Sequence, residues 1–169
     1  GGRKKTRVQL MGSGTILREV IAAAELLEND WDVSADVWSV TSFNELRRDG
    51  IDAERWNMLH PAKKKRIPYI TQQLAKTKGP IVAATDYMRT YADQVRNYID
   101  RTYLVLGTDG FGRSDMRAAL RRFFEVNRYY VVVAALTALA EDGEIDAKIV
   151  TRAIKQYGID PEKPNPVTV

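Results

Sequence analysis

The amino-acid sequence predicts an α/β domain in which a mostly parallel sheet of about four strands is covered on both faces and followed by a helical C-terminal segment. Up to Gly107, short β-branched runs alternate with segments whose apolar residues recur at helical spacing, and beyond it the patterns are helical. Such alternation is typical of parallel strands joined by right-handed crossovers. With 169 residues, of which 44% are hydrophobic, the chain is long enough to bury a single core.

The first part of the chain predicts a strand, a turn, a helix and a second strand. Residues 8–11 form a short apolar run that stops at Gly12 and Gly14. Between residues 16 and 27 apolar side chains recur three and four positions apart, which favours a helix. Residues 33–41 contain β-branched and aromatic residues and predict a second buried strand.

The middle of the chain predicts three short helices and two further strands. In chain order these are a helix from Asp52 that ends before Pro61, a helical piece over residues 69–76, a strand over residues 81–84, a helix from Asp86 and a strand over residues 103–106. Proline lacks the N–H that a helix interior requires, so Pro61 marks the end of the first helix. In the third helix, four apolar residues fall on one stripe: Met88, Tyr91, Val95 and Ile99.

Three helices are predicted after residue 107, before a proline-rich extended tail over residues 161–166. The first runs from the candidate N-cap Ser114 towards Phe124, the second covers residues 131–139, and the third begins near Asp146 and ends at Gly158. Glycine suits the left-handed conformation that follows many helices, so Gly158 is a natural terminator.

Composition excludes several classes of function. The chain has no cysteine, which excludes a disulfide scaffold, cysteine-ligated zinc, an iron–sulfur cluster and a cysteine nucleophile. The longest unbroken apolar run, residues 131–136, is too short to span a bilayer, and the basic start is not followed by the apolar stretch of a secretory signal. We therefore expect a cytoplasmic protein without a membrane partner.

The net charge of +4 and the pI near 9.3 raise the hypothesis of nucleic-acid binding. Basic runs occur at residues 3–7, 63–66 and 117–128, but acidic residues are interspersed and no aromatic–basic recognition motif is present. Solvated helix faces and loops explain these runs, so no nucleic-acid partner is expected.

Two glycine-rich loops are candidate sites because ligands of open α/β sheets bind beyond the carboxyl ends of the strands. The first contains Gly12, Ser13, Gly14 and Thr15 between a strand and a helix, where free N–H groups could hold an anion. The alternative is a plain tight turn, because Leu17 occupies the place of the third glycine in a dinucleotide-binding fingerprint.

The second loop follows the fourth predicted strand and is the stronger candidate. It reads Gly107, Thr108, Asp109, Gly110, Phe111, Gly112, Arg113, Ser114 and Asp115. One hypothesis is a binding or interface loop, in which the arginine grips a carboxylate or phosphate. The other is a structural turn that fixes Phe111 in the core and caps the next helix.

His60 is a weaker candidate. It is the only histidine and lies at a predicted helix end, so the chain cannot form a histidine-rich metal site. The sequence also lacks the G-x-S-x-G elbow that would supply a serine nucleophile. The residues alone therefore indicate no catalytic residue.

Five segments read together resemble a known family. They are residues 8–20, 39–46, 55–61, 85–88 and 106–115, and the similarity extends from residue 8 to residue 166. Together they resemble the C-terminal region of the homodimeric type of pyruvate dehydrogenase. The Phe111-Gly112-x-Ser114 motif is also similar to a loop near the end of transketolases, which share the thiamine diphosphate-dependent architecture.

The resemblance implies a three-layer transketolase C-terminal-domain fold over residues 1–169 as a single domain. Its mixed five-stranded sheet would include an antiparallel strand upstream of Gly1. In that family the pyrophosphate and magnesium lie on an N-terminal domain and the aminopyrimidine on a middle domain, both expected to be absent here. The resemblance thus implies no catalytic, cofactor-binding or metal-binding residue in this chain.

The parent enzyme of the resemblance decarboxylates pyruvate with thiamine diphosphate and magnesium and passes an acetyl group to lipoyl groups of a dihydrolipoyl transacetylase. The expected role of this chain is structural: it supports the homodimer and is inactive alone. Its expected partners are the rest of its polypeptide, the second subunit and the transacetylase. The rival hypothesis is a free-standing α/β module that binds a small anion or nucleotide.

Overall fold

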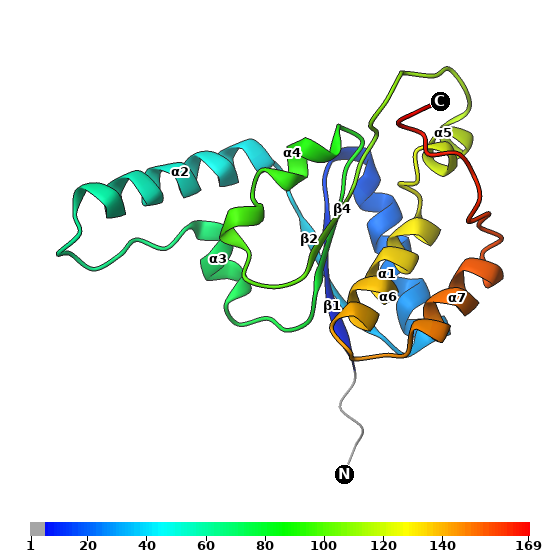
Figure 1. Ribbon diagram of the computed structural model, residues 1–169, viewed down its shortest axis with the longest axis horizontal. Helices are drawn as coiled ribbons and strands as arrows, with labels where there is room; N and C mark the ends of the chain where they lie inside the picture. Colours follow the sequence, from blue (N-terminus) through cyan, green and yellow to red (C-terminus); the bar gives the residue numbers. More distant parts are fainter. Residues whose placement is uncertain (1–5) are drawn as a thin grey trace, which may run out of the picture.

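The computed structural model describes residues 6–169 and contains a four-stranded parallel sheet (Figure 1). The strands are β1 (Arg7–Gly12), β2 (Ser34–Ser39), β3 (Ile81–Ala84) and β4 (Tyr103–Leu106), in the order β2-β1-β3-β4. Every pair of neighbouring strands is parallel, which confirms the predicted α/β class. Most of the basic run at residues 3–7 lies outside the described residues.

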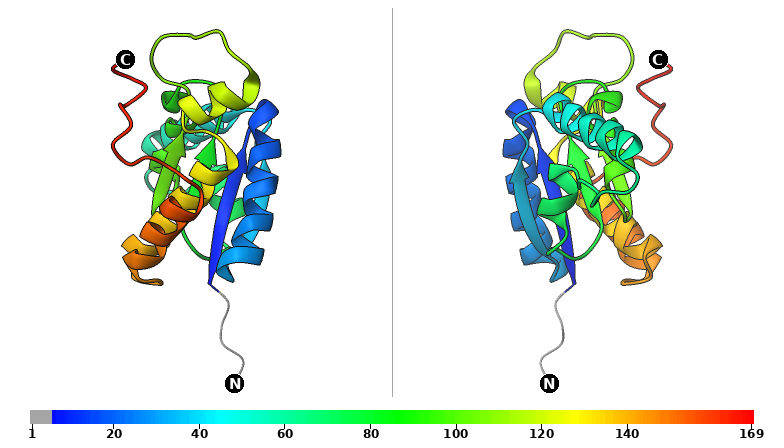
Figure 2. Two further views of the ribbon diagram at one scale, coloured as in Figure 1. Left: turned by 90° about the vertical axis from the view of Figure 1, so that its right-hand side faces the viewer. Right: turned by 90° about the vertical axis from the view of Figure 1, so that its left-hand side faces the viewer.

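Helices cover both faces of the sheet (Figures 1 and 2). On one face lie α1 (Leu17–Trp31), which follows the 3-10 turn η1 (Gly14–Ile16), then α6 (Arg128–Glu141) and α7 (Ala147–Gln156). The other face carries α2 (Phe43–Leu59), α3 (Tyr69–Leu74), α4 (Arg89–Asp93) and the 3-10 turn η2 (Arg96–Tyr98). Helix α5 (Arg117–Phe123) lies above the carboxyl edge of the sheet.

Two hydrophobic clusters, one on each face, make the sheet the middle of three layers. Side chains of a strand point alternately to the two faces. In β1, Leu10 joins the cluster with α1 and α6, whereas Met11 joins the cluster with α2, α3 and η2. In β3, Val82 and Ala83 divide in the same way. Because β1 and β3 are buried on both faces, their sequences are short apolar runs, from which the strands could be predicted.

Helix α2 begins at Phe43, so the prediction of a helix that starts at Asp52 was wrong at its beginning. The hydroxyl of Ser42 accepts a hydrogen bond from Glu45 N at 3.2 Å, an N-cap that the S-x-x-E spacing announces. Gly50 does not interrupt the helix. A Cβ there would lie 2.2 Å from the ring of Tyr98, so glycine allows this ring to pack closely.

The helix predicted from Asp86 is shorter and broken. It is divided into α4 and η2, and its supposed apolar stripe is split, since Val95 is buried whereas the side chain of Met88 is 56% exposed. Helix α4 begins at Arg89, whose N–H donates to Asp109 Oδ1 at 3.0 Å. A carboxylate distant in sequence thus determines where this helix begins.

The C-terminal helices agree with the prediction except at the starts of α5 and α6. Ser114 does not cap α5, which begins three residues later at Arg117. Helix α6 begins at Arg128 because Asn127 Oδ1 accepts hydrogen bonds from two backbone N–H groups, earlier than the predicted residue 131. The predicted cap of α7 is confirmed, since Asp146 Oδ1 accepts from Lys148 N at 2.8 Å. Gly158 is left-handed, as predicted, with φ of 59°.

Within the described residues, one segment, Arg117–Glu141, is long and apolar enough to cross a membrane by length and composition, with a mean hydropathy of 1.2. The structure divides it into α5 and α6, and Glu125 between them has a left-handed φ of 61°. Helix α6 packs against α1, α7, β3 and β4. Packing in the core of the domain therefore accounts for its hydropathy.

Candidate functional site

Three loops meet beyond the carboxyl edge of the sheet, at the top of Figure 1. They follow β1, β3 and β4 and contain the Gly12–Thr15 turn, Asp86 and the 107–115 loop. Strands β1 and β3 are neighbours although β2 lies between them in sequence, so the chain changes direction across the sheet at this point. Crevices at such switch points are the usual ligand sites of open α/β sheets.

An open cavity of about 330 Å³ lies between these loops and α5. It is lined by Thr15, Ile16, Asp86, Thr108, Gly110, Gly112, Arg113, Arg117, Leu120, Arg121, Phe124 and Val126. The structure thus brings together the two glycine-rich segments that the sequence singled out.

Hydrogen bonds tie the first turn to the end of β3. Ser13 Oγ donates to Thr85 Oγ1 at 2.9 Å, and Thr15 Oγ1 donates to Asp86 Oδ2 at 3.2 Å. Gly14 has a left-handed φ of 54°, and a Cβ at this residue would lie 3.2 Å from Asp86 Oδ1. The turn is therefore built around the carboxylate of Asp86.

The 107–115 loop is held at two points. Asp109 binds the start of α4, through the N–H of Arg89 at 3.0 Å and its Nε atom at 3.4 Å. Gly110, with φ of 101°, lies against the C-terminal tail, and a Cβ there would approach the carbonyl oxygen of Pro166 to 2.6 Å. The buried Pro166 thus rests on the loop.

The structural interpretation of this loop was wrong in both of its details. The side chain of Phe111 is 82% exposed instead of buried, and Ser114 does not cap α5. Asp115 Oδ1 instead accepts from Met116 N at 2.6 Å, and the Met116 side chain is also 82% exposed. The loop presents two large apolar side chains to solvent, as a binding or interface loop would.

The arginines of the cavity differ in their surroundings. The guanidinium of Arg113 lies over the ring of Phe123 at 4.3 Å, whereas Arg121 donates to Glu19 Oε1 at 2.8 Å. Among the described residues, neither Arg113 nor Arg117 has an ion pair. The cavity wall therefore carries two arginines, Arg113 and Arg117, that form no ion pair among the described residues, and it also carries the carboxylate of Asp86.

Glu19 is a buried carboxylate beside the cavity that was not among the candidates predicted from the sequence. Its side chain is 8% exposed and also accepts hydrogen bonds from the N–H and the Nε of Arg128, each at 3.0 Å. Burial alone would raise the pKa of Glu19, but the hydrogen bonds from Arg128 and the charge of Arg121 outweigh it and lower the pKa below its usual value. The available signal was a glutamate on the apolar stripe between Ile16 and Ala23.

His60 lies away from the cavity, at the far end of α2. Its ring stacks on Trp56 with a centroid distance of 4.4 Å, and its Nδ1 lies 2.9 Å from the Trp56 carbonyl oxygen. The guanidinium of Arg66 also lies over Trp56, at 4.5 Å. These contacts lie at the tip of a projecting arm, which is formed by α2 and the connection that follows it (residues 43–68, Figure 1). The structure does not bring His60 together with the other candidates.

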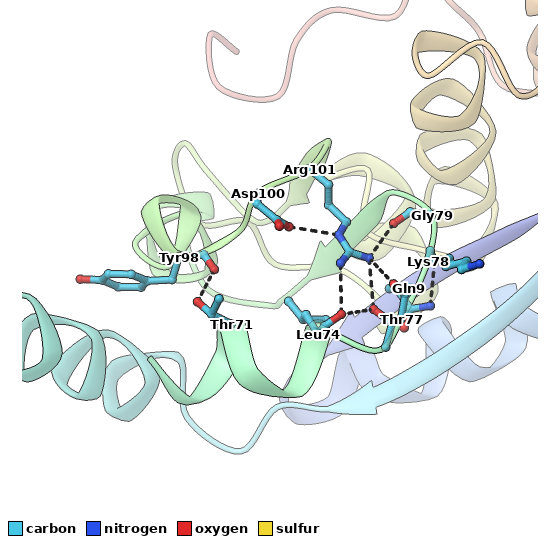
Figure 3. Close-up of polar contacts among 9 residues, drawn as sticks. All are labelled: Gln9, Thr71, Leu74, Thr77, Lys78, Gly79, Tyr98, Asp100 and Arg101. Carbon is cyan, nitrogen blue, oxygen red and sulfur yellow. Dashed lines mark hydrogen bonds and ion pairs between the residues drawn. The ribbon is translucent and has the colours of Figure 1, made fainter. Parts of the chain in front are cut away.

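A second polar cluster lies at the opposite edge of the sheet, before β3 and β4 (Figure 3). Arg101 Nη2 donates to the carbonyl oxygen of Leu74 at 3.1 Å, while Nη1 donates to those of Thr77 and Gly79 at 3.1 and 3.4 Å. The guanidinium thereby satisfies the carboxyl end of α3, a structural role.

Across residues 6–169, no three histidine, aspartate or glutamate side chains gather where they could hold a metal ion. We therefore assign no cofactor step to these residues.

Comparison with known proteins gives the context of this geometry. The model of the family described as "Transketolase-like TK C-terminal domain" matches residues 2–127. The chain is 60% identical over 161 residues to the Pyruvate dehydrogenase E1 component of Pseudomonas aeruginosa, and 58% identical over 163 residues to that of Escherichia coli. These alignments cover 95% and 96% of this chain but only 18% of each relative.

Among solved structures, the chain resembles a "Split gene transketolase, inactive beta4 tetramer" with a TM-score of 0.58 and 15% identity. The alignment covers 81% of this chain and 40% of that structure, a likeness of fold alone. The family match and the parallel sheet agree with the resemblance found in the sequence. The chain belongs to the transketolase C-terminal domain family.

Proposed function

We propose that this chain is the C-terminal domain of a homodimeric pyruvate dehydrogenase, the thiamine diphosphate- and magnesium-dependent enzyme that decarboxylates pyruvate and passes acetyl to lipoyl groups of a dihydrolipoyl transacetylase. The observation that carries the proposal is the 60% identity over 161 residues to such a component. We place the protein in the cytoplasm, as the sequence predicts.

The role we propose for this domain is support of the dimer and of the approach to the active site. Thiamine diphosphate, when bound to other parts of the enzyme, supplies the carbanion chemistry. This chain supplies surfaces. Exposed apolar side chains occur on the 107–115 loop, at Phe111, and on the arm, where Met58 is 71% and Ile67 53% exposed. Such residues fit contacts with the rest of the polypeptide, with the second subunit or with the transacetylase.

A chimera tests the proposal. The 169-residue chain replaces the corresponding C-terminal segment of the Escherichia coli component, and pyruvate-dependent activity and molecular mass are measured. We expect a dimer with activity near that of the parent, because 58% identity leaves most contacts in place. The control is the same enzyme truncated before this segment, which should lose both dimerisation and turnover. A truncated enzyme that remains dimeric and fully active would contradict the proposed supporting role of this domain.

The rival hypothesis is a free-standing module that binds a small anion or nucleotide. It is favoured by Arg113 and Arg117 of the cavity, which form no ion pair within residues 6–169. Immunoblotting of source cells with an antibody against this chain separates the two. A band several times larger than 19.1 kDa, which copurifies with thiamine-dependent pyruvate decarboxylation, supports the enzyme domain. A band at 19.1 kDa supports the free-standing module.

A further inference from the structure

The cavity beyond the carboxyl edge shares the 107–115 loop with the supporting role proposed above, but that role does not use the interior of the cavity. We propose that it is a binding site for a small phosphate monoester that also carries hydroxyl groups. Arg113 and Arg117 would bind the phosphate, and Asp86 would accept hydrogen bonds from the hydroxyls. The inference stands on the cavity alone and does not depend on the identity of the parent enzyme.

The position and the size of the cavity are those of a ligand site. It lies between the ends of β1 and β3. The chain leaves β1 towards β2 on one side and continues from β3 towards β4 on the other, so this is the switch point of the sheet. Its volume of about 330 Å³ is at the small end of the range for small-molecule pockets. A compact ligand therefore fits better than a dinucleotide.

Charge on the wall is divided between two sides. Arg113 and Arg117 come from the segment that leads into α5, whereas Asp86 follows β3. Within the described part of the chain, no ion pair joins Asp86 to any of the lining arginines. The opposite charges therefore remain separate, which leaves each of them available to a ligand.

Two of the residues that would bind the ligand, Arg113 and Asp86, are already held in place. Stacking on Phe123 positions Arg113, and that ring also has Lys163 Nζ at 5.3 Å from its centroid. Asp86 accepts from Thr15 Oγ1 at 3.2 Å through its side chain and from Thr108 Oγ1 through its carbonyl oxygen. Because these contacts exist without ligand, binding would require little ordering of these two side chains.

The chemistry of the two sides selects the ligand. A guanidinium presents a planar set of donors that matches a phosphate. An ionised carboxylate accepts hydrogen bonds only, so Asp86 would repel a bare phosphate and favour a ligand that offers hydroxyl donors on that side. A hydroxylated phosphate monoester satisfies both walls, whereas inorganic phosphate satisfies one.

Calorimetric titration of the full 169-residue chain with glycerol phosphate and with inorganic phosphate tests the site. We expect saturable binding of both, tighter for glycerol phosphate. Arg117→Gln should weaken both by roughly tenfold or more, the effect of one lost charge-assisted hydrogen-bond pair. Arg117 is exposed and unpaired among the described residues, so the thermal transition of this variant should match that of the wild type. The control is Arg48→Gln, an exposed arginine on α2, which should leave both affinities unchanged.

Asp86→Ala tests the hydroxyl side separately, because alanine has no hydrogen-bond acceptor whereas asparagine would keep one. If Asp86 accepts hydroxyl hydrogens, the substitution removes the preference for glycerol phosphate over inorganic phosphate. If the carboxylate only repels anions, the affinities for glycerol phosphate and for inorganic phosphate rise equally. That result would overturn the proposal that the ligand carries hydroxyl groups. Absence of saturable binding, or equal weakening by Arg48→Gln and Arg117→Gln, would overturn the site itself.

Discussion

Glu19 joins three parts of the chain that are distant in sequence. From α1 its buried carboxylate reaches Arg121 of α5 and Arg128 at the start of α6. The ion pair with Arg121 thereby ties α5 to α1, and α5 forms part of the cavity wall. A buried carboxylate that loses its charge leaves two arginines without their partner.

We expect Glu19→Gln to lower the free energy of unfolding by about 1–3 kcal/mol, because the amide cannot satisfy both guanidinium groups as an anion does. Urea denaturation at neutral pH measures this change. The matched control is Glu45→Gln, which breaks an exposed pair with Arg48 and should change stability by less than about 1 kcal/mol. Equal effects of the two substitutions would contradict the role of Glu19.

The lowered pKa of Glu19 predicts a pH dependence. A carboxyl whose pKa is lower in the folded than in the unfolded chain stabilises the fold above its unfolded pKa, and this contribution is lost as the pH falls through the folded pKa. The stability difference between wild type and Glu19→Gln should therefore be constant near neutral pH and narrow below the ordinary glutamate value of 4.5. Denaturation curves at decreasing pH measure it. A difference that widens in acid would refute the assignment.

Residue-level signals explain what the sequence analysis found and missed. The turn at Gly158 and the cap at Asp146 were predictable because each acts on its nearest neighbours. The cap of α4 was not, since Asp109 lies twenty positions beyond the N–H that it accepts. The alternative that buries Phe111 in the core was wrong: large apolar side chains are usually buried, and nothing local marks this exception.

At the scale of elements, α2 shows how a glycine can serve packing. Gly50 lies within the helix where the ring of Tyr98, itself 6% exposed, passes close to the backbone. The helix predicted from Asp52 leaves Gly50 outside it, and glycine is a weak helix former. Contact with η2 outweighs that local cost.

We expect Gly50→Ala to destabilise the protein by about 1–3 kcal/mol, because the new methyl would require the buried Tyr98 ring to move. Thermal unfolding followed by circular dichroism measures the change. Gly112→Ala is the control, since a Cβ at Gly112 meets no atom within 4 Å. A stabilised Gly50→Ala variant would show that helix propensity dominates at this position.

The connection between α3 and β3 depends on Arg101, whose guanidinium reaches three carbonyl groups (Figure 3). Arg101→Lys keeps the charge, but one ammonium cannot reproduce this planar set of donors. We expect faster amide hydrogen exchange over residues 74–80 and a loss of about 1–2 kcal/mol. Arg48→Lys on the exposed face of α2 is the control. An unchanged rate of amide hydrogen exchange in this segment would mean that the turn is stable without the hydrogen bonds from Arg101.

At the scale of the whole molecule, the tail supports the site. Lys163 Nζ donates to the carbonyl oxygen of Phe123 at 2.8 Å and to Glu125 Oε1 at 2.9 Å, and Pro166 lies against Gly110. We expect truncation after Glu162 to increase amide exchange over residues 107–124 while the exchange of β1 and β3 remains slow. Lys155→Gln, on α7, is the control. Uniform exchange changes across the sheet would show that the tail supports the whole fold instead.

The strands were predictable, whereas the site was only partly so. Strands β1, β3 and β4 are local apolar runs, and alternation with helices gives parallel pairing. The second strand, predicted as a buried strand over residues 33–41, is the shorter edge strand β2, which is partly exposed because it has a neighbour on one side only. That β1 lies between β2 and β3 is a matter of topology, and this order is what places the Gly12–Thr15 turn beside Asp86. The arginines of α5 were noted only as a basic run, because their common wall exists only once α5 folds over the sheet edge.

The position of β1 between β2 and β3 also has a consequence for how the chain acquires its structure. Gln9 pairs with Asp36 on one side and with Ile81, much later in the sequence, on the other. A ribosome therefore releases the complete β1-α1-β2 unit well before β3 emerges. Pairing between β1 and β3 must then close the long loop that contains the arm, and such non-local closure is slow. During synthesis, the edge of β1 that later pairs with β3 has unpaired backbone N–H and C=O groups. In this interval the nascent chain is most exposed to pairing with a wrong strand.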